Sequence, residues 1–198
     1  MPILVDGDFI HKRKELFYIM TKQISRWRQF WQSVWVGIVA GMISGMVKIG
    51  WEKILPPRTL ARDATNPPQR MLEQLGATSK FVHTYIYYNT DQKVYWVALI
   101  LHFSFSIFFA WLLIYLVQYD KLGWLGKWQG ALYGIIIWVA WHLIIMPALG
   151  TTPAPWNEPF AEHFSEFFGH IVWAWAIVAV AYFMIEKWPS SDLTTDNL

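Results

Sequence analysis

The sequence contains no cysteine and few charged residues, and both shortages narrow what the protein can be. Without cysteine there is no disulfide framework, no thiolate metal site and no cysteine nucleophile. Only 15% of the residues are charged, whereas 55% are hydrophobic and 18% aromatic, which is not the composition of a soluble domain. A net charge of +2 is too small to indicate a nucleic-acid partner. The composition therefore indicates a membrane protein.

Catalytic motifs are missing as well. The sequence has no Gly-x-Ser-x-Gly elbow, no glycine-rich phosphate loop and no dinucleotide fingerprint, so it does not predict an enzyme and assigns no catalytic residue. The first long apolar segment begins only near Trp31 and is too long for the apolar region of a signal peptide. We therefore expect the N-terminus to remain on the mature chain.

Four apolar segments are long enough to cross a bilayer as helices. They predict an all-α, polytopic membrane protein with transmembrane helices at about residues 31–54, 94–117, 128–147 and 163–187. Together they form one domain over residues 31–187, with a loop at residues 55–93 and a polar tail at residues 188–198. Fourteen tryptophans agree with this interpretation, because tryptophan collects at membrane interfaces.

Residues 1–30 have the pattern of a basic amphipathic helix. Apolar side chains such as Leu16, Met20 and Ile24 recur at helical spacing, and lysines and arginines lie mostly between them. Such a helix is expected to lie on a leaflet of anionic lipid. A solvated helix that only holds the cytoplasmic side is an equal alternative.

The distribution of basic residues predicts the orientation. Lysine and arginine gather before the first segment and recur in the second connection as Lys121 and Lys127, whereas the third connection has neither. The positive-inside rule then places both termini in the cytoplasm and the loop at residues 55–93 in the periplasm, although that loop also carries Arg58, Arg62 and Arg70. We expect a multi-pass protein of the bacterial inner membrane.

One further helix is predicted inside the first loop. Asn66 is a favourable N-cap, Pro67 suits the first helical position, and Gly76 follows the last turn.

Small residues mark where helices can approach closely. Gly37, Gly41 and Gly45 share one face of the first segment, and Gly130 and Gly134 share one face of the third. We expect these faces to serve helix packing. The first face is also a candidate contact for a second copy of the chain or for another membrane protein.

Ionisable residues occupy one depth of the predicted helices. At about 1.5 Å per residue, the residues that fall in the outer half are Lys48, Glu52, His102, His142, Glu166 and His170. Charged groups at membrane depth are costly and face protein or water-filled cavities, so this layer is the candidate functional site. Arg58, Glu162 and His163 are expected at its wet rim.

Three hypotheses follow for this layer. Histidine changes charge near physiological pH, so His102, His142 and His170, with Glu166 as partner and Lys48 as fixed charge, can form a proton relay facing the periplasm. Alternatively, His102, His142, Glu166 and His170 can bind a metal or haem, because imidazoles from different helices are common ligands. Otherwise no cofactor is expected. Third, the same groups can form a hydrogen-bonded network in a structural subunit or scaffold of a larger assembly.

A family resemblance covers all four predicted segments. It is carried by GMISGMVKIGWE at residues 41–52, LPPR at 55–58, HFSFSIFFA at 102–110, WQG at 128–130, HLIIMPALGTTPAP at 142–155 and SEFFGHIVW at 165–173. These stretches resemble the YagU family of bacterial inner-membrane proteins. The matching positions are Lys48, Glu52, Pro56, Pro57, Arg58, His102, His142, Glu166 and His170. The resemblance implies a protein of unknown biochemical activity associated with acid resistance, which favours the titrating hypothesis over the metal hypothesis.

Overall fold

The computed structural model describes the backbone of residues 7–55, 64–116 and 125–186, and the side chains of residues 26–55, 64–116 and 128–185. Arg58 and the tail at residues 188–198 lie outside the described residues. The elements, in chain order, are α1 (Gly7–Ile54), α3 (Pro67–Gln74), α4 (Ser79–Val82), β1 (Ile86–Tyr87), β2 (Lys93–Val94), α5 (Trp96–Leu116), α6 (Leu125–Trp138), the π-helix η2 (Val139–Ile145), α7 (Met146–Ala148), the 3-10 helix η3 (Pro155–Asn157) and α8 (Phe160–Glu186).

Four helical stretches in the described part of the chain are long and apolar enough to cross a membrane. They are Arg26–Ile54, Trp96–Leu116, Trp128–Ala148 and Phe160–Ile185. The four predicted helices are therefore confirmed, with ends that differ by a few residues. Which side of the membrane each end faces remains a prediction.

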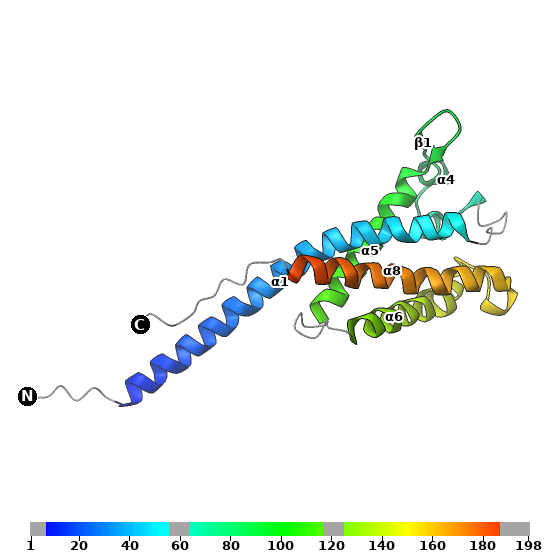
Figure 1. Cartoon of the computed structure of the whole chain (residues 1–198). Helices are drawn as coiled ribbons and strands as arrows, with labels where there is room; N and C mark the ends of the chain where they lie inside the picture. Colours follow the sequence, from blue (N-terminus) through cyan, green and yellow to red (C-terminus); the bar gives the residue numbers. More distant parts are fainter. Residues whose placement is uncertain (1–6, 56–63, 117–124, 187–198) are drawn as a thin grey trace, which may run out of the picture.

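The N-terminal helix is not a separate element. A single helix, α1, runs without a break from Gly7 to Ile54 and so includes both the predicted surface helix and the first span (Figure 1). The backbone therefore has no break at the predicted boundary between residues 30 and 31, and the placement of residues 1–30 on the membrane surface stays a prediction. The side chains that would contact lipid headgroups before residue 26 lie outside the described set, so binding of anionic lipid there stays a prediction.

The helix predicted in the first loop is present as α3. Asn66 accepts a hydrogen bond from the Gln69 backbone N–H at 3.1 Å, and the Gln69 side chain accepts one from the Asn66 N–H at 3.0 Å. These two bonds form a capping box, and Gly76 follows the helix with a φ of 97° that favours glycine. A short antiparallel hairpin that the sequence did not predict pairs Ile86 with Val94 and Tyr87 with Lys93.

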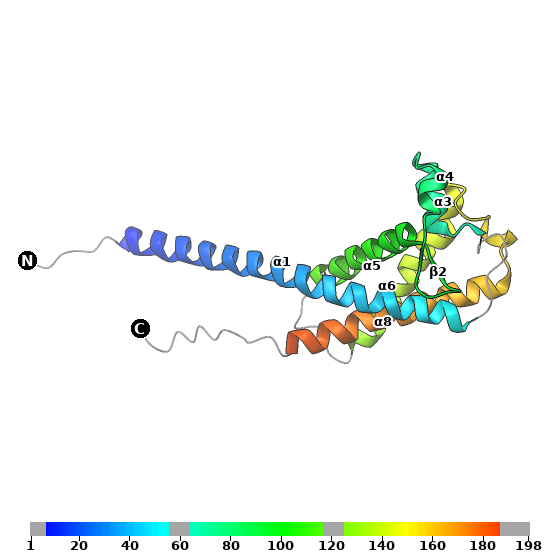
Figure 2. The ribbon, with the colours of Figure 1, turned by 90° about the horizontal axis from the view of Figure 1, so that it is seen from above.

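The spanning helices pack in the order α5, α1, α8, α6. The long helix α1 contacts both α5 and α8, and α8 in turn contacts α6 (Figures 1 and 2), whereas α5 meets α6 through side chains, including a hydrogen bond from the Tyr133 hydroxyl to the Phe109 carbonyl oxygen at 2.9 Å. The small elements α3, α4 and the hairpin gather at one end of this bundle, and the N-terminal part of α1 extends beyond the opposite end. α5 and the helix that carries η2 meet through aromatic side chains, such as Phe105 and Trp141.

The glycine faces bring these helices together. A Cβ atom on Gly41 would lie 2.4 Å from Ile107 Cα of α5, and one on Gly134 would lie 2.4 Å from the His170 carbonyl oxygen of α8. Gly37 and Gly45 also face α5, and Gly130 also faces α8. The face of α1 suggested as a contact for a second protein is therefore covered by α5 of the same chain, and oligomerisation would need another surface.

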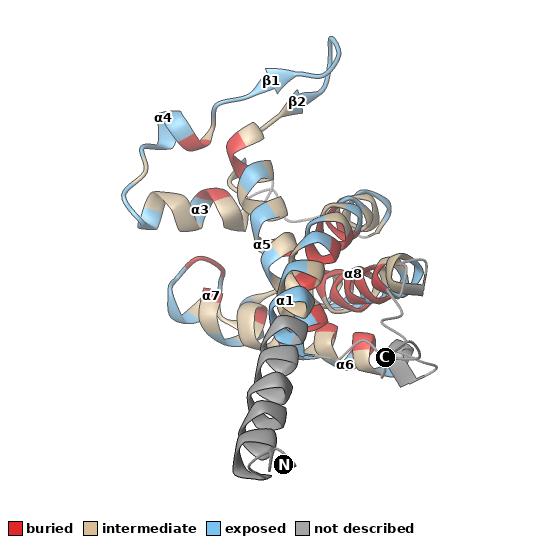
Figure 3. Ribbon diagram, turned by 90° about the vertical axis from the view of Figure 1, so that its left-hand side faces the viewer, coloured by how far each residue is buried: buried red, intermediate tan, exposed pale blue. Residues whose placement is uncertain are grey.

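The core lies where α1, α5 and α8 face one another. Buried residues, shown in red in Figure 3, include Val36, Ile114, Trp173 and Ile177. Large apolar side chains are also exposed along the outside of the spans, for example Trp35, which is 60% exposed. Outward apolar side chains suit helices whose surroundings are lipid rather than water.

Gly41→Ala tests the close contact between α1 and α5. The added methyl group would meet backbone, so we expect unfolding to become easier by about 1–3 kcal/mol, measured by thermal unfolding in detergent. Gly50→Ala in the same helix is the matched control, because a Cβ atom there meets nothing within 4 Å. Equal stability of the two variants would contradict the proposed contact.

Candidate functional site

A buried ion pair joins α1 to α8. Lys48 Nζ lies 2.9 Å from Glu166 Oε2 and 2.7 Å from Glu52 Oε1, which is one turn further along α1. The side chains of Lys48 and Glu166 are only 10% and 5% exposed. Lys48 therefore does not extend toward the membrane surface as an isolated lysine would. It bridges two carboxylates.

Two histidines approach the same carboxylate. His142 Nε2 lies 3.4 Å and His170 Nδ1 lies 3.8 Å from Glu166 Oε2. The two rings are also close to each other, with centroids 4.9 Å apart and planes at 76°. Glu166 is therefore the centre of the cluster, with neighbours from α1, η2 and its own helix.

The backbone fixes the orientation of His170. Its Nδ1 lies 2.7 Å from the carbonyl oxygen of Glu166, and because a carbonyl only accepts, Nδ1 must carry the proton. In the neutral ring the second nitrogen, Nε2, then has a lone pair. The ring is 3% exposed, and no described residue donates a hydrogen bond to Nε2.

His102 belongs to the same cavity but has a different partner. Its Nε2 donates a hydrogen bond to the Gly45 carbonyl oxygen of α1 at 3.2 Å. This bond follows from the contact between α5 and the glycine face of α1. The sequence grouped His102 with the residues that line this cavity, and its depth in the membrane stays a prediction.

A π-helix presents His142. Within η2 the helix widens, and Met146 N–H donates to the carbonyl of Trp141, five residues back. The next residue is Pro147, which has no N–H and cannot continue the α-helical ladder. Short π-segments inside α-helices often occur at functional sites. His142 is buried on this segment and faces Glu166 of α8.

Hydrogen bonds between helices also join the elements that carry the cluster. Ser106 Oγ donates to the Gly41 carbonyl oxygen at 2.7 Å and accepts from Trp173 Nε1 at 2.8 Å, which connects α1, α5 and α8. Trp51 Nε1 donates to the Ser165 carbonyl oxygen at 2.9 Å, close to Glu166. No sequence signal identified Trp51 as a partner of α8.

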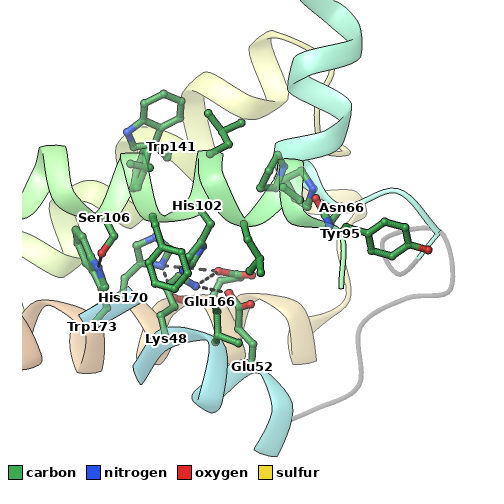
Figure 4. Close-up of a pocket in the computed structure, with 18 of the residues that line it drawn as sticks. Lys48, Glu52, Asn66, Tyr95, His102, Ser106, Trp141, Glu166, His170 and Trp173 are labelled. Atoms are coloured by element: carbon green, nitrogen blue, oxygen red, sulfur yellow. Dashed lines mark hydrogen bonds and ion pairs between the residues drawn. The ribbon is translucent and has the colours of Figure 1, made fainter. Parts of the chain in front are cut away.

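A cavity of about 830 Å³ opens beside the cluster. Its lining includes Lys48, Glu52, His102, His142, Glu166 and His170, so all six residues of the predicted layer reach one space. In Figure 4, Asn66 and Tyr95 lie at one end of the cavity and Ser106 and Trp173 at the other. Pro67 and Met71 of α3 also line it, so the first connection borders the cavity.

Of the predicted rim residues, the structure describes Glu162 and His163, and neither lines the cavity. Glu162 is only 5% exposed and does not line the cavity, so its prediction as a wet rim residue is wrong. It lies one turn before Glu166 on a face of α8 that is covered by protein. His163 is half-buried and donates from Nε2 to the Pro155 carbonyl oxygen at 2.7 Å. Arg58 is outside the described residues.

Three of the four alternative metal-binding residues come together. The candidate ligand atoms of His142, Glu166 and His170 lie within 4.8 Å of one another, whereas His102 is not in this group. The ammonium of Lys48, however, contacts the same Glu166 oxygen at 2.9 Å and competes with any second cation there. The positive charge of Lys48 beside Glu166 therefore favours the titrating hypothesis over the metal hypothesis.

An absorption spectrum with elemental analysis of the purified protein tests the metal and haem alternatives.

Lys48→Met tests the ion pair. Removing the Lys48 ammonium leaves the carboxylates of Glu52 and Glu166 without their cationic partner in a poorly solvated site. We therefore expect a loss of about 3–5 kcal/mol in the free energy of unfolding. The double variant Lys48→Met, Glu166→Gln is expected to recover part of this loss, because the uncompensated charge is removed. Lys80→Met, at an exposed position of α4, is the control. Equal free energies of unfolding for Lys48→Met and Lys80→Met in detergent would contradict a structural role for the ion pair.

Comparison of the chain with known proteins finds a matching family and a similar bacterial protein. The family described as "Protein of unknown function (DUF1440)" matches residues 42–179, a range that contains all six residues of the layer. "Inner membrane protein YagU" of Escherichia coli (strain K12) is 35% identical over 118 residues. This match covers 59% of the chain and 55% of that relative, so the chain spans little more than half of its length.

No solved structure matches the chain. The inner-membrane relative and the four apolar helices support the localisation predicted from the sequence. The match over residues 42–179 also confirms the predicted resemblance. The chain is a member of the DUF1440 family of proteins of unknown function.

Proposed function

We propose that the protein is a proton-responsive inner-membrane protein whose buried cluster titrates from the periplasmic side and contributes to acid resistance. The observation that carries this proposal is that His142, His170 and Lys48 all approach one oxygen of Glu166. Histidine is the side chain whose unperturbed titration falls between about pH 5 and 8. Acidification would therefore add positive charge next to an ion pair that holds two helices together.

The charge change has a structural consequence. Protonated His142 becomes a second cation beside the oxygen that Lys48 already contacts, so Lys48 and His142 compete for Glu166 while Lys48 keeps Glu52. Since Lys48 is on α1, His142 on η2 and Glu166 on α8, the competition acts across three elements. The ionisable groups on the surrounding elements are Glu52 and Lys53 of α1, His102 of α5, His170 of α8 and Lys93 of β2.

The cavity supplies a route for protons. It extends from the cluster to Asn66, which belongs to the loop at residues 55–93 expected in the periplasm, and to Tyr95, which follows β2 (Figure 4). In the predicted orientation, the end of the cavity at Asn66 faces the periplasm, which acidifies before the cytoplasm does. The YagU resemblance implies an association with acid resistance, and a titrating cluster gives that association a physical basis.

His142→Ala and His170→Ala test the proposal. In liposomes with an entrapped pH-sensitive dye, we expect the wild-type protein to show acid-dependent proton flux or an acid-dependent change in protease sensitivity. Each histidine variant should reduce this response toward that of protein-free liposomes, because the titrating group is missing. The same samples should be compared at neutral and acidic pH.

His83→Ala is the matched control, because His83 lies near α4, outside the cavity, and contacts Glu73 at 3.6 Å. It should leave the acid response unchanged. Flux and protease sensitivity that are indifferent to both cluster variants would contradict the proposal and would favour a purely structural network or a scaffold.

A further inference from the structure

We propose that the cavity binds a lipophilic organic monocation, a single positive charge on an apolar and aromatic body, in exchange with the proton of the cluster. This inference rests on the proposed function, since it assigns a ligand class to the same site. It follows from the size of the cavity, its aromatic walls and the hydrogen-bond character of its buried floor.

The cavity has the dimensions and walls of a site for a small organic molecule. Its volume of about 830 Å³ lies within the range of drug-sized binding pockets. Phe105, Trp141 and Trp173 contribute aromatic rings, with centroids 5.1 Å apart for Phe105 and Trp141 and 6.4 Å apart for Phe105 and Trp173. Aromatic faces attract cations, most strongly where water is excluded.

The cavity is bordered by helices that meet through side chains rather than through close backbone contact. Phe105 belongs to α5 and Trp141 to η2, and their rings contact each other although few backbone positions of the two elements come close. Both side chains are only half-buried. Both residues belong to helices that are long and apolar enough to cross a membrane, which suits a ligand that first partitions into lipid.

The buried floor presents acceptors rather than donors to a ligand. The Nδ1–H of His170 is used by the Glu166 carbonyl oxygen, so the neutral ring offers the lone pair of Nε2. The ammonium of Lys48 is directed to the carboxylates of Glu52 and Glu166. A ligand with a positive charge is complementary to imidazole lone pairs and carboxylates, whereas an anion would lie beside both carboxylates.

The other two lysines of the lining are at the mouth. Lys53 and Lys93 are both exposed, and Lys93 Nζ lies over the Tyr85 ring at 4.6 Å. Their charges are screened by water, while the charges of the floor are not. They therefore oppose a cation at the buried end of the cavity only weakly.

Protonation of the cluster and binding of the organic cation would oppose each other. A proton on His170 or His142 places a positive charge within the same cavity, and like charges at close range in a poorly solvated site repel strongly. The apparent affinity for the organic cation should therefore fall as the pH is lowered and the cluster gains a proton, by about tenfold once it is protonated. By linkage, the cation should in turn oppose protonation.

A pair of probes of equal shape and opposite charge gives a sharp test. The purified full-length protein in phospholipid nanodiscs is equilibrated with tetraphenylphosphonium or with tetraphenylborate, and empty nanodiscs correct for partition into lipid. We expect one tetraphenylphosphonium per chain at pH 8, and binding of tetraphenylborate that is at least about tenfold weaker. Equal or tighter binding of tetraphenylborate would overturn the inference.

Variants locate the bound cation. Ala98→Phe adds a ring to a buried residue that lines the cavity and should abolish binding, whereas Ile100→Phe, on the exposed side of the same helix, should leave it unchanged. Trp141→Leu keeps an apolar wall but removes an aromatic face, so it should weaken binding severalfold even where Ala98→Phe does not yield folded protein. Tetraphenylphosphonium binding that is unaffected by Trp141→Leu and by a folded Ala98→Phe variant would place the cation elsewhere and overturn the inference.

The acid response of the same wild-type sample separates the two proposals. An intact acid response without tetraphenylphosphonium binding overturns the ligand inference and leaves the proton-responsive function standing. An absent acid response overturns the proposed function, and with it the exchange between proton and cation, whatever the probe does.

Discussion

The ion pair between Lys48 and Glu166 is the interaction on which the candidate site depends. Charges buried at bilayer depth are tolerated only when they are paired and hydrogen-bonded, and here the partners come from helices far apart in the sequence. The pair joins α1 to α8, and η2 is held nearby because His142 approaches the same carboxylate. The arrangement of three elements is thus coupled to the charge of one small cluster.

Close helix contacts make this cluster possible. Gly41 and Gly45 let α5 approach α1 until His102 reaches the Gly45 carbonyl oxygen, and Gly134 lets the third span approach the backbone of α8 at His170. The cavity beside the cluster is lined by residues of α1, α5, η2 and α8, so these close contacts also fix the helices that form its walls.

Membership of the DUF1440 family gives no biochemical activity, so the site itself must supply the argument. The cavity combines aromatic walls, buried carboxylates and histidines that can gain a proton, and it reaches the connection that carries α3. A proton-responsive site and a site for a lipophilic cation are compatible interpretations of one geometry, because both place a single positive charge beside the same acceptors.

The sequence by itself determined the class, the number of candidate spans and which ionisable residues gather around one cavity. Apolar length, glycine spacing and helical rise are local properties, so they predicted four helices, the cap at Asn66 and a layer containing Lys48, His142, Glu166 and His170. Tertiary structure decided the rest. Which partner each group takes depends on the order and rotation of the helices, which local spacing does not encode. This is why His102 binds a backbone carbonyl, Glu162 is buried rather than wet, and Trp51 joins the site without any sequence signal.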